Sequence, residues 1–95
     1  MRADHAGITR CFEERVGAWF AGEGRERIGD RRSLRQMNMA LALALSRWLE
    51  LAEEDDATAA MRAWLAEVER RAEVRGATAR AESFAQARLW FDDCS

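Results

Sequence analysis

The chain has 95 residues, 34% of them charged, and its 15 basic and 17 acidic residues give a net charge of −2. This length suits a single domain, and the balanced charge does not favour a general attraction to nucleic acid or to acidic surfaces. Every basic residue is Arg and 19 residues are Ala. We attribute this bias to a GC-rich, bacterial genome rather than to Arg chosen for anion recognition.

The two cysteines, Cys11 and Cys94, lie far apart and form no metal-binding pattern. One disulfide is possible, but we expect two free thiols in a reducing cytoplasm, with Cys11 a small core residue and Cys94 exposed. Residues 1–5 lack the apolar stretch of a signal peptide, and no apolar run approaches the ~18 residues of a membrane span. These features predict a cytoplasmic, soluble protein with no membrane contact.

The first predicted element is an amphipathic helix over residues 5–21. Its apolar residues recur mainly at spacings of three and four, which places them on one face. They are Ile8, Phe12, Val16, Trp19 and Phe20. The single histidine, His5, lies at the start, in a segment that we expect to be mobile. Three glycines then bracket a polar connection over 22–29, where a helix is poorly supported, and Ile28 is expected to reach the core.

A second helix is predicted from Asp30 or Ser33 to about Glu54. Asp30 is a good N-cap, and Ser33 with Gln36 fits a capping box. Within residues 37–51, eleven of fifteen positions are apolar. Ala, Leu and Met are strong helix formers, so their alternation there indicates a helix and not a strand.

Two further helices follow. The third has capping residues within 55–58 and closes at Gly76, and the fourth is capped by Thr78 and ends before residues 92–95, which we expect to fray. Their apolar stripes are Met61, Trp64, Leu65, Val68 and Ala72 on the third helix, and Ala81, Phe84, Ala87 and Phe91 on the fourth. The sequence therefore predicts an all-α fold, a single domain over residues 1–95 built as a three- to four-helix bundle around a central apolar helix.

The second helix carries more apolar surface than one small core needs. Its core face consists of Leu34, Met37, Leu41, Leu45, Trp48 and Ala52. On its other sides lie Met39, Ala42, Leu43 and Leu49, interleaved with Asn38, Ser46 and Glu50. Either the other helices bury both surfaces inside one monomer, or the second surface contacts a second copy or a partner. We favour the second alternative, because each of the other helices offers one narrow apolar stripe.

Two sets of interface residues are predicted on this basis. The main set, expected to form a homodimer, is Met39, Leu43, Ser46 and Glu50. The lesser set is Leu89 and Trp90, because Leu89 points away from the stripe of its own helix and Trp is a frequent interface anchor.

Positive charge concentrates around the start of the second helix. The residues are Arg25, Arg27, Arg31, Arg32 and Arg35. Such a cluster could bind an anion or nucleic acid, but Glu23, Glu26 and Asp30 dilute its charge, and we favour a solvated, ion-paired segment. A second cluster, Arg70, Arg71, Arg75 and Arg80, has the same two interpretations.

No pattern in the sequence indicates catalysis. A glycine-rich phosphate loop, clustered histidines and a convincing pair of catalytic carboxylates are all missing, so we expect no enzymatic activity, cofactor or metal. The acidic run over 50–56 lacks the spacing of a calcium loop. We expect it to cap helix ends, or to contact the basic end of another molecule in an antiparallel dimer.

These observations favour a small non-catalytic protein–protein interaction module. It would be an adaptor, chaperone or inhibitor of a larger bacterial or phage complex, and a homodimer. The alternative is a nucleic-acid-binding regulator that uses the Arg25–Arg35 cluster. A third possibility is the noncatalytic subunit of an enzyme.

Overall fold

The computed structural model describes residues 5–95, and within that range every regular element is helical. Four long helices are joined by short connections, and the segment between the first two contains a π-helical turn and a single α-helical turn. The elements are α1 (His5–Ala18), η1 (Trp19–Glu23), α2 (Gly24–Arg27), α3 (Arg31–Leu51), α4 (Ala57–Val74) and α5 (Thr78–Cys94). The predicted small all-α bundle is thereby confirmed.

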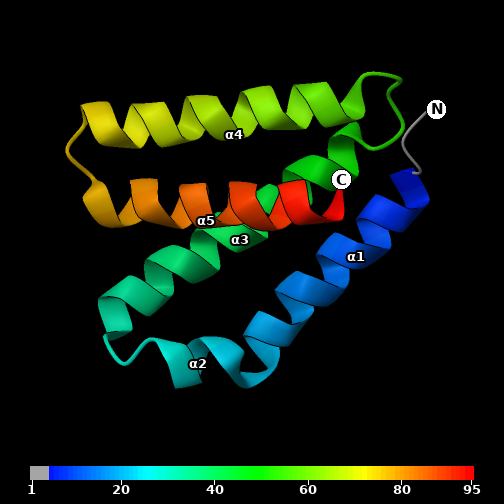
Figure 1. Cartoon of the computed structure of the whole chain (residues 1–95). Helices are drawn as coiled ribbons and strands as arrows, with labels where there is room; N and C mark the ends of the chain where they lie inside the picture. Colours follow the sequence, from blue (N-terminus) through cyan, green and yellow to red (C-terminus); the bar gives the residue numbers. More distant parts are fainter. Residues whose placement is uncertain (1–4) are drawn as a thin grey trace.

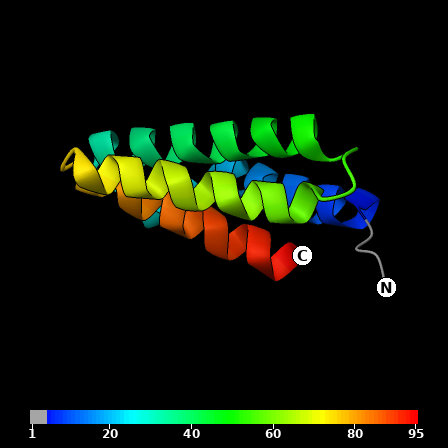
Figure 2. The same cartoon turned by 90° about the horizontal axis from the view of Figure 1, so that it is seen from above.

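Helix α5 lies at the centre of the arrangement, because α1, α3 and α4 all pack on it. Helices α4 and α5 form an antiparallel hairpin, α3 crosses α5, and α1 packs on both α3 and α5 (Figure 1). The Cα positions span 41 × 31 × 18 Å, so the molecule is flat. In Figure 2, α3 lies along one edge of the molecule with no helix beyond it. The predicted central helix is therefore covered on one side only.

The core contains most of the residues that helical periodicity predicts. Its largest fully buried side chains are Phe12, Leu41, Trp48, Met61, Leu65 and Phe91. The ring of Phe91 meets those of Phe12 and Trp48 at centroid distances of 5.6 and 5.0 Å, so α5 joins α1 to α3. Phe20 is an exception to the predicted stripe, because it is 44% exposed. Ile28 packs against the core as expected.

Polar atoms of the buried aromatic residues have partners on neighbouring helices. The Trp48 indole donates to Thr9 Oγ1 and the Trp19 indole to Asn38 Oδ1, both at 2.8 Å. Such bonds remove the cost of burying an unpaired N–H group. His5 was expected in a mobile segment, but its Nδ1 donates to the Ala52 carbonyl at 2.8 Å and its ring meets Trp48 edge-on. The start of α1 is therefore attached to the end of α3.

The helix ends follow the predicted capping residues in part. Asp30 caps α3 by accepting from the Ser33 backbone N–H at 2.9 Å, so the earlier of the two predicted starts is correct. Gly76 ends α4 with a φ of 74°, a left-handed conformation that favours glycine. Thr78 is the first residue of α5 and not its cap, and Asp56 makes no side-chain capping bond to α4.

The connection between α1 and α3 is more helical than expected. Its π turn and α2 pack together because Gly24 lies against the ring of Trp19, which is 3% exposed. A Cβ atom at Gly24 would stand 2.6 Å from the nearest ring carbon. Glycine is therefore required here for close packing.

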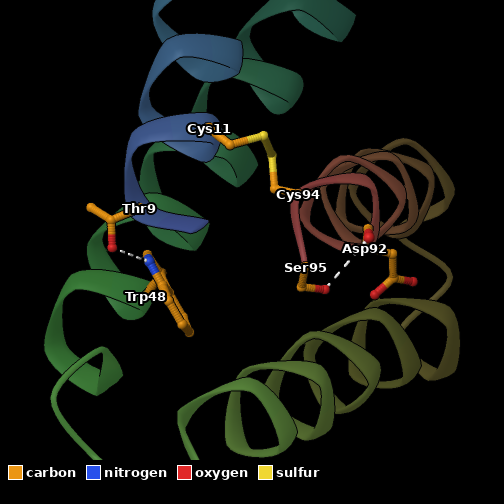
Figure 3. The surroundings of a disulfide bond; sticks show 6 residues. All are labelled: Thr9, Cys11, Trp48, Asp92, Cys94 and Ser95. Carbon is orange, nitrogen blue, oxygen red and sulfur yellow. Dashed lines mark hydrogen bonds between the residues drawn. A yellow bond between two sulfur atoms is a disulfide. The ribbon is translucent and has the colours of Figure 1, made fainter. Parts of the chain in front are cut away.

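The expectation of two free thiols is wrong, because Cys11 and Cys94 form a disulfide between α1 and the end of α5 (Figure 3). Their Cα atoms lie 5.6 Å apart, Cys11 is exposed and Cys94 half-buried. Cys11 is thus not a core residue. Residues 92–95 do not fray either, since α5 continues to Cys94 and Arg62 pairs with Asp92 at 3.2 Å.

The expected cytoplasmic location rested partly on free thiols, and the disulfide removes that support. No helix within the described range is long and apolar enough to cross a membrane. The polar start of the chain, which was the other basis for that location, falls mostly on residues 1–4 and so outside the described residues.

Replacing Gly24 with Ala should destabilise the fold by about 1–3 kcal/mol, because the rigid indole of Trp19 cannot move away from the added methyl group. Urea denaturation followed by tryptophan fluorescence measures the change. Gly29→Ala is the matched control, because a Cβ there meets no atom within 4 Å. Equal stabilities of the two variants would contradict the role given to Gly24.

Reducing the disulfide should lower the free energy of unfolding by roughly 4.5 kcal/mol, the chain-entropy value for residues 83 apart in sequence. The loss arises because the reduced unfolded chain gains conformational freedom. Thermal unfolding of the oxidised chain, the reduced chain and the Cys11→Ser, Cys94→Ser double variant measures it. Identical melting temperatures for all three would show that the bridge does not constrain this fold.

Candidate interaction surfaces

An apolar strip runs along the outer side of α3. We call it the outward strip, and it consists of Met39, Ala42, Leu43, Ser46, Leu49 and Glu50, all of them exposed. Met39 is 45%, Leu43 49% and Leu49 51% exposed, whereas Leu41, Ala44 and Trp48 on the inner side are fully buried. The four residues predicted for the main interface, Met39, Leu43, Ser46 and Glu50, therefore all lie on one accessible side of the helix.

A hollow of about 360 Å³ adjoins the outward strip where α1 meets α3. Small residues contribute to it on both helices, namely Gly17 on α1 and Ala42 and Ser46 on α3, together with the apolar side chains of Phe20, Leu45 and Leu49. Sequence periodicity assigned Phe20 to the core and missed this role. Phe20 follows the buried Trp19 in the π turn and is 44% exposed.

A second hollow, of about 190 Å³, lies on the other flank of α3, against α4 and α5. Leu43, Trp64 and Phe84 line it, and Arg75 and Arg80 contribute positive charge. The guanidinium of Arg47 lies 5.9 Å from the Trp64 ring centroid. Leu43 thus continues the apolar surface from α3 toward the α4–α5 hairpin.

The lesser predicted interface reduces to one residue. Leu89 is 52% exposed, but Trp90 is only 6% exposed. The Trp90 ring meets Trp19 at a centroid distance of 5.6 Å, and the Arg15 guanidinium lies 3.6 Å from its centroid. Trp90 is therefore a core residue capped by a cation, and it is not part of an exposed patch with Leu89.

The Arg25–Arg35 cluster is divided by its acidic neighbours. Arg27 pairs with Glu23 at 2.9 Å, and Arg15 pairs with the same carboxylate at 2.6 Å. Hydrogen bonds from Arg15 and Arg27 lower the pKa of Glu23 below its ordinary value. Arg25 is exposed and not ion-paired within the described range. The remaining three residues form what we call the basic end of α3, which is Arg31, Arg32 and Arg35, all exposed and without an ion pair to a described residue.

The second Arg cluster is also partly ion-paired. Arg70 and Arg71 bind the carboxylate of Glu67 at 2.8 and 3.0 Å, and their hydrogen bonds lower the pKa of Glu67. These ion pairs agree with the interpretation of this cluster as a solvated, ion-paired surface. Arg75 and Arg80 remain exposed beside the 190 Å³ hollow.

Negative charge collects at the opposite end of α3. This acidic end consists of Glu50, Glu53 and Glu54, all exposed. Among the described residues, the acidic end forms one ion pair, a long contact of 3.9 Å between Glu50 and Arg47. No group of three potential metal ligands occurs in residues 5–95.

A hollow of about 250 Å³ between α2, α3 and α5 was not foreseen from the sequence. It is lined by Trp19, Met37 and Trp90 together with Arg27, Glu82 and Gln86. These residues come from segments far apart in the chain. Local periodicity therefore gives no signal for it.

Comparison of the chain with protein-family models, curated proteins and solved structures finds no match.

Acidification should destabilise the fold as the pH falls below about 4.5, the ordinary pKa of the two carboxyls Glu23 and Glu67. Their folded-state pKa values are lowered, so the stability that they contribute is present above pH 4.5 and is lost as the pH falls through the folded values. Melting temperatures of the unmodified chain and of the Glu23→Gln, Glu67→Gln variant, measured from pH 7 to 2, test this. The variant should show the smaller decrease, and Glu73→Gln, at an exposed position, should behave like the unmodified chain. Equal decreases in all three would contradict the assignment.

Proposed function

We propose that this chain is a small non-catalytic protein–protein interaction module that acts as a homodimer, as an adaptor, chaperone or inhibitor within a larger bacterial or phage complex. The observation that carries the proposal is the outward strip of α3, where Met39, Leu43 and Leu49 are each about half exposed along one helix. Aligned apolar side chains of this kind on a small protein are typical of an association surface.

The neighbouring hollows support the same proposal. The 360 Å³ hollow on the α1 flank and the 190 Å³ hollow on the α4–α5 flank adjoin the strip on its two sides. Phe20 and Leu45 extend the apolar surface on one flank, and Trp64 extends it on the other. A partner helix seated on α3 would therefore contact apolar atoms on both sides as well as beneath it.

The compartment is a separate part of the proposal. Disulfides persist in oxidising compartments and are rare in the reducing cytosol. The Cys11–Cys94 bridge therefore supports an oxidising compartment, and the cytoplasmic location expected from the sequence is the alternative. Alkylation of the thiols in cells quenched with acid distinguishes these two locations. Cysteines that cannot be alkylated indicate an oxidising compartment, and cysteines that react indicate the cytoplasm.

A nucleic-acid-binding regulator is the second candidate, favoured by the basic end of α3, where three exposed Arg residues have no described ion partner. Phosphate contacts release counterions, so such binding weakens steeply as salt is added. Fluorescence anisotropy with duplex DNA and with RNA, at low and high salt, tests it. Absent binding at low salt would eliminate this candidate, and so would binding that ignores salt.

Replacing Leu43 with Glu should weaken homodimerisation by about 2 kcal/mol or more, because a charge would be placed in the apolar surface that the second copy covers. Sedimentation velocity over a concentration series measures the effect, and circular dichroism checks that helix content is retained. Val74→Glu is the matched control, because Val74 is 75% exposed at the far end of α4. If Leu43→Glu and Val74→Glu dimerise equally well, the outward strip is not the association surface.

A further inference from the structure

We infer that the occupant of the outward strip is a second copy of this chain, with the two α3 helices packed antiparallel about a twofold axis near residue 44. The inference rests on the proposed function and adds to it the orientation and register of the two copies. It rests on the spacing of exposed residues along α3, on the size of their side chains and on the charges at the two ends of the helix.

Seven of the exposed positions on α3 and the turn after it follow a heptad spacing. Intervals of three and four residues alternate without interruption from residue 32 to residue 53. The positions are Arg32, Arg35, Met39, Ala42, Ser46, Leu49 and Glu53, and each is exposed. This is the spacing with which one helix presents a continuous seam to another. The fully buried Leu41, Ala44 and Trp48 occupy other heptad positions, so the seam lies on the side of α3 that faces away from the core.

One antiparallel register pairs all the layers of this seam from Arg35 to Glu53. In this register Met39 faces Leu49 of the second copy, and Ala42 faces Ser46 of the second copy. The two central layers then contain only small side chains, which lets the helix axes approach to about 8 Å, the lower end of the usual range. Apolar layers flank them, and the twofold axis repeats every contact.

The same register brings opposite charges together at both ends. Arg35 faces Glu53 of the second copy, and Arg32 lies close by on the same acidic end. The seam between these two charged layers is about 27 Å long at 1.5 Å per residue. A parallel pair would instead place three Arg beside three Arg and the acidic end beside its copy. The charges therefore select the antiparallel orientation.

The charge pattern of α3 is the reverse of the one that stabilises an isolated helix. A helix dipole favours acidic residues in the first turn and basic residues in the last turn. In α3 the first turn holds Arg31 and Arg32, and the last turn holds Glu50 and no basic residue. For α3, the helix dipole gives no reason to place Arg31, Arg32 and Glu50 where they are, whereas pairing with an antiparallel copy does.

Charge reversal at one end of α3 tests the orientation. One variant reverses the basic end (Arg32→Glu, Arg35→Glu), a second reverses the acidic end (Glu50→Arg, Glu53→Arg), and a third carries all four changes. In an antiparallel dimer either single-end variant meets like charges at both ends, so its dissociation constant should rise roughly tenfold to hundredfold over the unmodified chain. The four-change variant restores attraction at both ends and should dimerise like the unmodified chain.

The controls separate this inference from the proposed function. All three variants place charges that the helix dipole favours, so circular dichroism should show full helix content and loss of the dimer cannot be assigned to unfolding. Added salt should weaken the unmodified dimer, because it screens the attraction between opposite charges. It should strengthen association of the single-end variants, because there it screens repulsion between like charges. A dimer that is unaffected by single-end reversal would overturn the antiparallel register while leaving a homodimer in place. A chain that is monomeric before any substitution would overturn both, and would assign the strip to a different protein.

Discussion

The packing of α3 on one side only is the constraint on which the rest of this structure depends. Helix α3 has 21 residues and apolar side chains on several sides, whereas α1, α4 and α5 each contribute one buried stripe. Three such stripes cover the inner side of α3 and leave its outer side exposed, which gives a flat molecule 18 Å thick in its shortest dimension. The outward strip and the hollows beside it follow from this shortage of covering surface.

A second constraint keeps this thin arrangement together. Helix α1 contacts α3 and α5 but has little contact with α4, so it is held along one margin of the molecule. The Cys11–Cys94 bridge and the His5 contact with Ala52 secure the first half of α1, while Trp19 and its bond to Asn38 secure the segment that follows. Because α1 forms one wall of the 360 Å³ hollow, these attachments also determine the shape of the proposed interface.

Much of this architecture could be predicted from helical periodicity. The apolar stripes containing Phe12, Leu41, Met61 and Phe84 fixed which side of each helix faces the core, and the exposure of Met39 and Leu43 follows from the same periodicity. Features that depend on contacts between distant segments could not be obtained this way. The disulfide needs the middle of α1 to meet the end of α5, and the burial of Trp90 depends on Trp19 and Arg15 from another part of the chain. Phe20 was misassigned because it lies at the margin of the predicted stripe, about 100° around the helix from the buried Trp19.

Light scattering after size exclusion, over a hundredfold dilution, gives the absolute mass of the unmodified, oxidised chain and tests self-association through α3 directly. We expect a species of twice the chain mass of 10.8 kDa at high concentration, which either persists throughout or dissociates to the monomer on dilution. A monomer at every concentration would show that no second copy covers the outer side of α3.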